Sequence, residues 1–195
     1  QKSFKISLEN EVLGYDTFNL NALATDMGFF ELWASQLFEA SGTIAARVTL
    51  ARVYVNDRYD GLRFLVENLD GDLVRNHGLK KGHIYREKTN AFLGHNFTEP
   101  NSEGIFVKYQ GLENIKRVWE KNTRKNKGWK TFKNFNDAIN DGINNGSEVW
   151  KDFINFDSYL KYLAIIHITG TFHNNNHNIP LYRPNGSDAF TLIGY

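Results

Sequence analysis

The sequence has 195 residues, 41% of them hydrophobic and 14% aromatic, which suffices for one large domain or two small ones and excludes global disorder. Its 23 lysine and arginine residues nearly balance its 22 acidic residues, and at a net charge of +1 strong nonspecific binding to nucleic acid is not expected. The absence of cysteine excludes disulfides, thiolate metal sites and cysteine catalysis, and no apolar run reaches the roughly 18 residues that span a bilayer.

A strand is predicted over residues 2–7, where polar and apolar side chains alternate. Lys2, Phe4 and Ile6 share one face of this strand, and Lys5 lies on the other. A lysine on the apolar face is unusual, because burying an unpaired ammonium group is costly. Lys2 therefore either has an acidic partner or lies at a frayed strand end and reaches water.

A helix is predicted over residues 27–40, and Ser41-Gly42 ends it. Glu31 lies near its start, beside an apolar stripe made of Phe30, Trp33, Leu37 and Phe38.

A β-hairpin is predicted next, from the β-branched residues of Val48 to Val55, a turn at Asn56-Asp57, and a second strand over Gly61 to Val66. After a link at residues 67–71, a short helix is expected over 70–76 and a short strand over 82–86.

Helical periodicity dominates the rest of the chain. Helices are predicted over residues 111–122, around Phe135 with an end at Gly142, and over Val149 to Phe153. Asp157 is expected to cap a fourth helix. That helix is predicted to be buried because its residues are almost continuously apolar: Tyr159, Leu160, Tyr162, Leu163, Ile165 and Ile166. A last hairpin is expected over 180–195, turning at residues 184–186.

This order of elements predicts the fold class. Strands with one helix come first and helices dominate later, which indicates an α+β fold with a β-rich N-terminal lobe and an α-rich C-terminal lobe. The boundary is expected near residues 67–76, so that the lobes comprise residues 1–70 and 71–195.

A basic run extends from Lys116 to Lys133. A solvated helix face and loop is the commoner interpretation of such a run, and a docking patch for an anion is the alternative.

The segment from Thr169 to Tyr182 places many polar side chains directly after the most apolar helix. Kinase catalytic loops place a metal-binding asparagine five residues after an acid. Asn178 stands in the asparagine position of that spacing, and His173 stands in the position of the acid.

The chain resembles the spore coat protein H (CotH) kinase family in segments that span nearly its whole length. The hairpin that ends in Gly61-Leu62, followed by Glu67, is the most specific of them. The matching segments are residues 2–6, 18–22 with Asp26, 53–62, Glu67, 82–86 and 170–182.

This resemblance implies a single atypical protein-kinase-like domain over residues 1–195, in agreement with the predicted two lobes. It implies transfer of phosphate from ATP to a protein substrate, with Mg²⁺ or Mn²⁺ as the metal. It also implies a location outside the cell, at the cell surface or on the spore surface.

The resemblance assigns roles residue by residue. Lys2 would pair with Glu31 and hold the α- and β-phosphates, and Lys5 would take that role if the strand register is shifted by one face. Glu67 would occupy a hinge between the lobes, where a backbone edge meets adenine; an exposed linker charge is the alternative. Asn178 would bind the metal through its amide oxygen.

Two departures from the family weaken the implied activity. The family commonly has an aspartate where His173 stands; histidine can accept a proton near neutral pH, but its ring reaches further and it lacks the anionic charge. The resemblance also places the phosphate-binding loop before Gln1 and a second metal-binding acid just after Tyr195. The chain is then either a piece of a longer protein or a degenerate member with weakened or lost kinase activity.

Two alternative interpretations place the protein in functional classes other than the kinases. His173 and His177 have the spacing of zinc ligands on a helix, but the asparagines between them indicate a loop, and no third ligand is evident nearby. A noncatalytic structural or adhesive module would instead use exposed aromatic residues for a structural partner, although core packing is the commoner explanation for such residues; the candidates are Tyr54, Tyr59, Trp129 and Tyr182.

Overall fold

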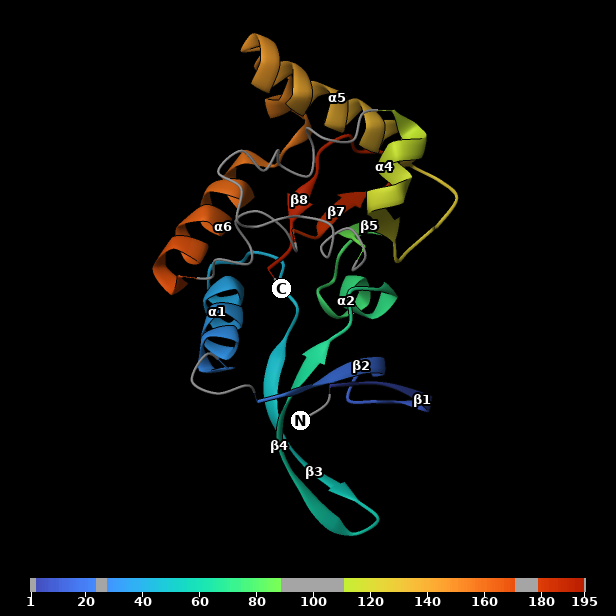
Figure 1. Cartoon of the computed structure of the whole chain (residues 1–195), viewed down its shortest axis with the longest axis vertical. Helices are drawn as coiled ribbons and strands as arrows, with labels where there is room; N and C mark the ends of the chain where they lie inside the picture. Colours follow the sequence, from blue (N-terminus) through green and yellow to red (C-terminus); the bar gives the residue numbers. More distant parts are fainter. Residues whose placement is uncertain (1–2, 24–27, 89–110, 171–178, 195) are drawn as a thin grey trace.

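The computed structural model describes residues 3–23, 28–88, 111–170 and 179–194 (Figure 1). Within these residues the chain forms two four-stranded antiparallel sheets, with strand orders β1-β2-β4-β3 and β6-β5-β7-β8. The mixed α+β class predicted from the order of elements is confirmed. No helix in the described part of the chain is long and apolar enough to cross a membrane.

The first sheet consists of two hairpins. Strands β1 (Phe4–Val12) and β2 (Tyr15–Ala22) form one, and β3 (Val48–Val55) and β4 (Arg58–Glu67) form the other. The predicted second hairpin is confirmed, with Asn56 and Asp57 both at positive φ (50° and 63°), as in the turns that match strand twist. Because β4 lies between β2 and β3, its last residue, Glu67, is a central position of the sheet.

The second sheet consists of β5 (Gly82–Glu87), β6 (Trp119–Lys121), β7 (Leu181–Pro184) and β8 (Thr191–Leu192). The helix predicted over 111–122 is too long: α4 (Leu112–Val118) ends where β6 begins. Trp119 is buried and pairs with Glu87 of β5, so pairing with a distant strand overrides the helical periodicity there.

The remaining helices are α1 (Gly28–Ala40), α2 (Gly71–Asn76), α5 (Trp129–Asn145), the 3₁₀ helix η2 (Val149–Phe153) and α6 (Phe156–Thr169). Helix α5 continues past its predicted end at Gly142 and ends at Gly146, which takes the left-handed conformation. The predicted cap of α6 is wrong by two residues, because the Asn155 side chain accepts from Ser158 N–H at 3.2 Å. Asp157 instead pairs with Lys161.

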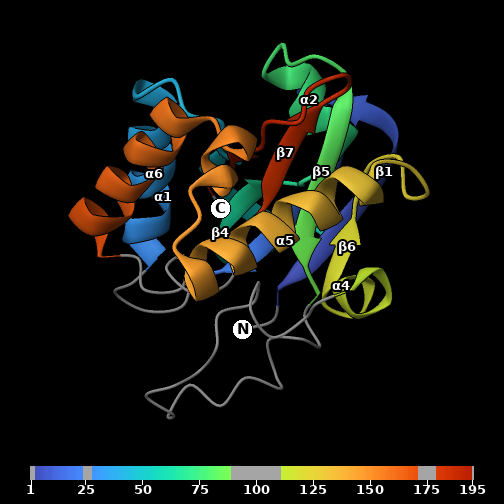
Figure 2. The same ribbon diagram turned by 90° about the horizontal axis from the view of Figure 1, so that it is seen from above.

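Helix α6 buries only one face. Tyr162, Ile165 and Ile166 are buried, and α6 packs beside α1, as both views show (Figures 1 and 2). Leu160 and Ile168 are exposed, so the prediction that the whole helix is buried is wrong. An apolar sequence run therefore overstated the burial of this helix.

Two clusters of buried side chains form the core. One is rich in aromatic residues and joins α1, α5 and α6 to the second sheet, with Phe132 stacked on Tyr85 at 4.5 Å between ring centroids. The other joins the two sheets, because it contains Phe64 and Val66 of β4 together with Ile84 of β5 and Tyr182 of β7. The division at residue 70 stays a prediction, since the strands on its two sides share this second cluster.

Candidate functional site

The predicted catalytic segment lies between two well-anchored elements. Gly170 ends α6 in the left-handed conformation (φ 64°), and its N–H donates to Ile166 O. On the other side, Leu181 begins β7, is buried, and pairs with both Tyr85 and Leu192. His173, His177 and Asn178 lie outside the described residues, so the roles predicted for His173 and Asn178 and the zinc alternative stay predictions.

The residue Gly194, just after β8, is hydrogen-bonded to the segment that precedes β3. Gly194 N–H donates to Ile44 O at 2.9 Å, and Ala46 N–H donates to Gly194 O at 2.8 Å. A Cβ atom on Gly194 would overlap the Phe38 ring of α1. The backbone just before the position to which the resemblance assigns the second acid is therefore fixed against α1 and the segment before β3.

Of the residues predicted to form the lysine–glutamate pair, the structure describes Glu31 and the alternative lysine, Lys5. Glu31 lies in the first turn of α1 and is exposed. Lys5 is exposed in β1, opposite Asn19, and within the part of the chain that the structure describes it forms no ion pair with Glu31. Lys2 lies outside the described residues, so its pairing with Glu31 stays a prediction.

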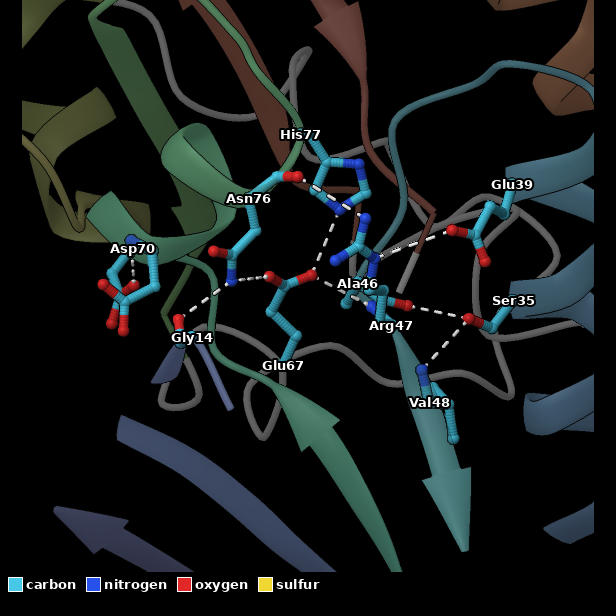
Figure 3. Close-up of polar contacts among 11 residues, drawn as sticks. Gly14, Ser35, Glu39, Ala46, Arg47, Val48, Glu67, Asp70, Asn76 and His77 are labelled. Atoms are coloured by element: carbon cyan, nitrogen blue, oxygen red, sulfur yellow. Dashed lines mark hydrogen bonds and ion pairs between the residues drawn. The ribbon is translucent and has the colours of Figure 1, made fainter. Parts of the chain in front are cut away.

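Glu67 is fully buried, with 0% of its surface exposed, so the interpretation as an exposed linker charge is wrong. One carboxylate oxygen, Oε2, accepts from Arg47 N–H at 3.2 Å and lies 3.1 Å from Nε2 of His77. The other, Oε1, accepts from Asn76 Nδ2 at 3.0 Å (Figure 3). Both oxygens are therefore bound by the protein itself, at the meeting point of β3, β4 and the end of α2.

The backbone of Glu67 is also paired. Its N–H donates to Arg47 O at 2.9 Å, and the residue stands opposite Phe18 in β2. A hinge contact between a backbone N–H and adenine, as the resemblance implies, would have to come from the residues that follow Glu67. The nucleotide role of Glu67 stays a prediction, but it is not a role for its carboxylate or its N–H.

Hydrogen bonding decides the charge of Glu67. Burial alone would raise the pKa of its carboxyl group, but hydrogen bonds from His77, Asn76 and the Arg47 N–H, together with the charge of His77, outweigh burial, and the net pKa is lowered. Glu67 is thus a buried, ionised carboxylate at neutral pH that accepts hydrogen bonds from donors on two elements.

The same network binds the β1–β2 turn to α2. Asn76 Nδ2 also donates to Gly14 O at 3.1 Å (Figure 3), and Arg75 donates to Glu11 at 2.9 Å. Asp72 accepts from Asp16 N–H at 2.9 Å and pairs with Arg75. The first hairpin is therefore positioned by polar contacts from α2, in addition to its pairing with β4.

A second polar cluster was missed by the sequence reasoning. Lys121 of β6 is buried; its Nζ donates to Nδ1 of His83 at 2.7 Å and to Arg124 O at 2.7 Å, and a third bond reaches Lys127 O. Because Nδ1 accepts, His83 is neutral. Burial, with the charges of Lys121, Arg183 and Arg124, lowers the pKa of His83 to about 4.

Burial also lowers the pKa of Lys121, to about 8, with further lowering by the charges of Arg183 and Arg124. Arg183, likewise buried, comes from β7. No local sequence signal marks this cluster, because its members come from three strands of the second sheet.

Within the described residues, no group of three or more histidine, aspartate or glutamate side chains is arranged to hold a metal ion. The predicted metal ligand, Asn178, lies outside that part of the chain. The described residues thus supply only the elements beside the predicted site residues: the end of α6, the start of β7, the end of β8 and α1.

Comparison with known proteins gives one finding. The family model described as CotH kinase protein matches residues 1–195, the whole chain. No curated protein matches the chain significantly.

Proposed function

The chain belongs to the CotH kinase protein family, and we propose on that basis that it binds ATP with Mg²⁺ or Mn²⁺ and that its transfer of phosphate to protein hydroxyls is weakened or lost. The observation that carries this proposal is His173, which stands five residues before Asn178 at the position of the catalytic acid. Membership of the family supports a kinase-like domain and the use of ATP. The histidine at the position of the catalytic acid supports a reduced rate of phosphate transfer.

Residue roles follow from this proposal. Asn178 binds the metal, and Lys2, oriented by Glu31, holds the α- and β-phosphates. ATP supplies the phosphoryl group, whose transfer depends mainly on positioning and on stabilising charge. Glu67 holds the end of β4 against α2 through its three hydrogen-bonding partners, and thereby positions the link between the sheets.

His173 explains why transfer would be slow. An aspartate at this position accepts or orients the proton of the attacking hydroxyl with a short anionic group. A neutral imidazole can accept a proton near pH 7, but it adds no negative charge and its nitrogen atoms lie further from the backbone. Catalysis by a positioned general base typically contributes about 10²–10⁴-fold, which sets the size of the expected loss.

Binding and transfer are tested separately on the full-length protein. We expect ATP with Mg²⁺ or Mn²⁺ to raise the melting temperature, and the rise to disappear in Asn178→Ala. Labelled phosphate transfer should be slow in the wild type. Fast transfer that disappears in His173→Ala would contradict the proposed loss of activity.

A noncatalytic structural or adhesive module is the second candidate, and the tip of the β3–β4 hairpin favours it. Tyr54 and Tyr59 are 60% and 58% exposed, with ring centroids 5.4 Å apart, and Val55 beside them is exposed. Tyr182, in contrast, is buried in the core, as the commoner explanation by core packing predicts, and Trp129 is half-buried, so neither is an exposed partner contact.

This second candidate would act in an assembly outside the cell or on the cell or spore surface. Absence of any nucleotide-dependent shift in the full-length protein would favour it over the kinase. Loss of assembly in Tyr54→Ser/Tyr59→Ser, with unchanged melting temperature, would then identify the hairpin tip as the contact.

A further inference from the structure

The turn between β6 and α5, together with the first turn of α5, exposes a cluster of basic side chains. We call these residues the cationic turn: Arg124, Lys125, Lys127 and Lys130. All four side chains are exposed, and none forms an ion pair within the described part of the chain. Lys116 and Lys133, on either side, do pair with Glu113 and Asp137. The four residues of the cationic turn are thus unpaired, whereas the lysines on either side of it, Lys116 and Lys133, are paired.

Two side chains, buried Lys121 and half-buried Trp129, fix the backbone of the cationic turn. Lys121 donates to the carbonyl oxygens of Arg124 and Lys127, and Trp129 Nε1 donates to Lys125 O at 2.9 Å. Because these carbonyl groups are bound to groups at the base of the turn, the turn keeps one backbone shape while its charged side chains extend into solvent. A preformed cationic surface loses less entropy on binding than a flexible one.

Positive charge also lies beneath the cationic turn. Buried Lys121 and Arg183 have no ion pair with any carboxylate that the structure describes, and Nε of Arg183 is buried without a hydrogen-bond partner. Helix α5 adds its positive N-terminal end there, since Gly128 provides no side-chain cap and the first turn contains no acid. A Cβ atom on Gly128 would approach Arg183 Nη2 to 2.8 Å, which places the helix start beside that guanidinium group.

This excess of charge is local, because the whole chain has a net charge of only +1. The lowered pKa of Lys121, caused by burial and by Arg183 and Arg124, is consistent with the same local excess. An anionic partner at the cationic turn would therefore gain from exposed, buried and helix-end charges together.

We propose that the cationic turn is a docking surface for an acidic segment of a partner protein. Four neighbouring cations match a short run of carboxylates, and the net charge of +1 gives no broader basic surface of the kind that binds nucleic acid. None of its four residues is among those assigned to ATP and metal, so the docking proposal does not depend on phosphate transfer.

The test uses the full-length protein without nucleotide and a fluorescein-labelled, glutamate-rich peptide, followed by fluorescence anisotropy. We expect binding that weakens about tenfold when the ionic strength rises from about 0.05 M to about 0.3 M. The variant Lys125→Glu/Lys130→Glu should bind about tenfold more weakly than the wild type. Lys151→Glu/Lys161→Glu, which makes the same charge change on η2 and α6, should bind as the wild type does.

The melting temperature of Lys125→Glu/Lys130→Glu shows whether weaker peptide binding comes from loss of folding. Lys130→Glu places an acid in the first turn of α5, where the helix dipole favours negative charge, so the melting temperature should not fall. Equal loss of peptide binding in both double variants would overturn the proposal, as would binding that neither responds to salt nor changes in Lys125→Glu/Lys130→Glu. Tighter binding of a single-stranded oligonucleotide of equal charge would overturn it in favour of nucleic acid.

Discussion

Replacing Glu67 with alanine tests whether this residue is structural. The carboxylate is completely buried and binds the Arg47 N–H, Asn76 and His77 at 3.2, 3.0 and 3.1 Å. Truncation would leave these donors without their acceptor at a site that water does not reach. A donor left unsatisfied in this way costs about 1–3 kcal/mol, and loss of one member of a buried charged network about 3–5 kcal/mol. We therefore expect Glu67→Ala to lose about 3–5 kcal/mol of unfolding free energy.

Glu67→Gln makes the prediction sharper. Its one oxygen can replace Oε2 and keep Arg47 N–H and His77, but its NH₂ group then faces the NH₂ group of Asn76. Asn76 cannot turn over without losing its bond to Gly14 O. One unsatisfied donor remains, so the expected loss is about 1–3 kcal/mol, smaller than for alanine.

Urea denaturation of the full-length protein at several pH values measures both variants. Because the pKa of Glu67 is lowered in the folded state, the stability it contributes is present above the ordinary carboxyl pKa of 4.5 and is lost as the pH falls through the lower folded value. Glu67→Gln should therefore lose less stability than the wild type on acidification below pH 4.5.

Two results would refute this reasoning. Glu67→Ala with wild-type stability would show that the network holds nothing together. Glu67→Gln with wild-type stability but without the ATP-dependent rise in melting temperature would show that the carboxylate serves the nucleotide instead.

Three further predictions concern His83 of β5, the start of α6 and the end of β8. The pKa of His83 falls from 6.5 to about 4 on folding, so protonation favours the unfolded state. The unfolding free energy should therefore fall by about 3 kcal/mol as the pH drops from 6.5 to 4. In urea titrations, His83→Gln should show a weaker dependence of stability on pH over this range. Asn155→Ala should destabilise the protein by about 1 kcal/mol because it removes the α6 cap. Asp157→Ala, which removes only the pair with Lys161, should cost at most about 0.5 kcal/mol. Equal losses of stability in thermal melts would contradict the assignment of Asn155 as the cap. Gly194→Ala should cost about 1–3 kcal/mol by overlap with Phe38, and an unchanged melting temperature would show that α1 and the end of β8 are not packed as described.

Local signals explain the elements that the sequence could predict. The β3–β4 hairpin has β-branched strands and an Asn56-Asp57 turn, and α2 begins after Asp70, whose side chain accepts from Asp72 N–H. These features lie within a few residues of one another, so the sequence alone specifies them. Strand β2 carries such a signal too, because Phe18, Leu20 and Ala22 alternate with Thr17, Asn19 and Asn21, but it is not among the predicted strands.

Long-range contacts explain what could not be predicted. Strand β6 has three residues and exists because it pairs with β5. The partners of Glu67 come from the start of β3 and the end of α2, and those of Lys121 from β5 and the turn before α5. Residue types along the chain indicate that Glu67 and Lys121 are charged, but only the packed sheets determine that both are buried and bonded.

The substitution His173→Asp tests the central claim most directly. Labelled phosphate transfer by the full-length protein with ATP and Mg²⁺ would be compared between the wild type, His173→Asp and His173→Ala, with the ATP-dependent melting shift as a control for binding. We predict equal shifts in all three, and transfer at least about tenfold faster in His173→Asp than in the wild type. Wild-type transfer that is fast, falls in His173→Ala and does not rise in His173→Asp would contradict the claim that histidine limits this kinase domain.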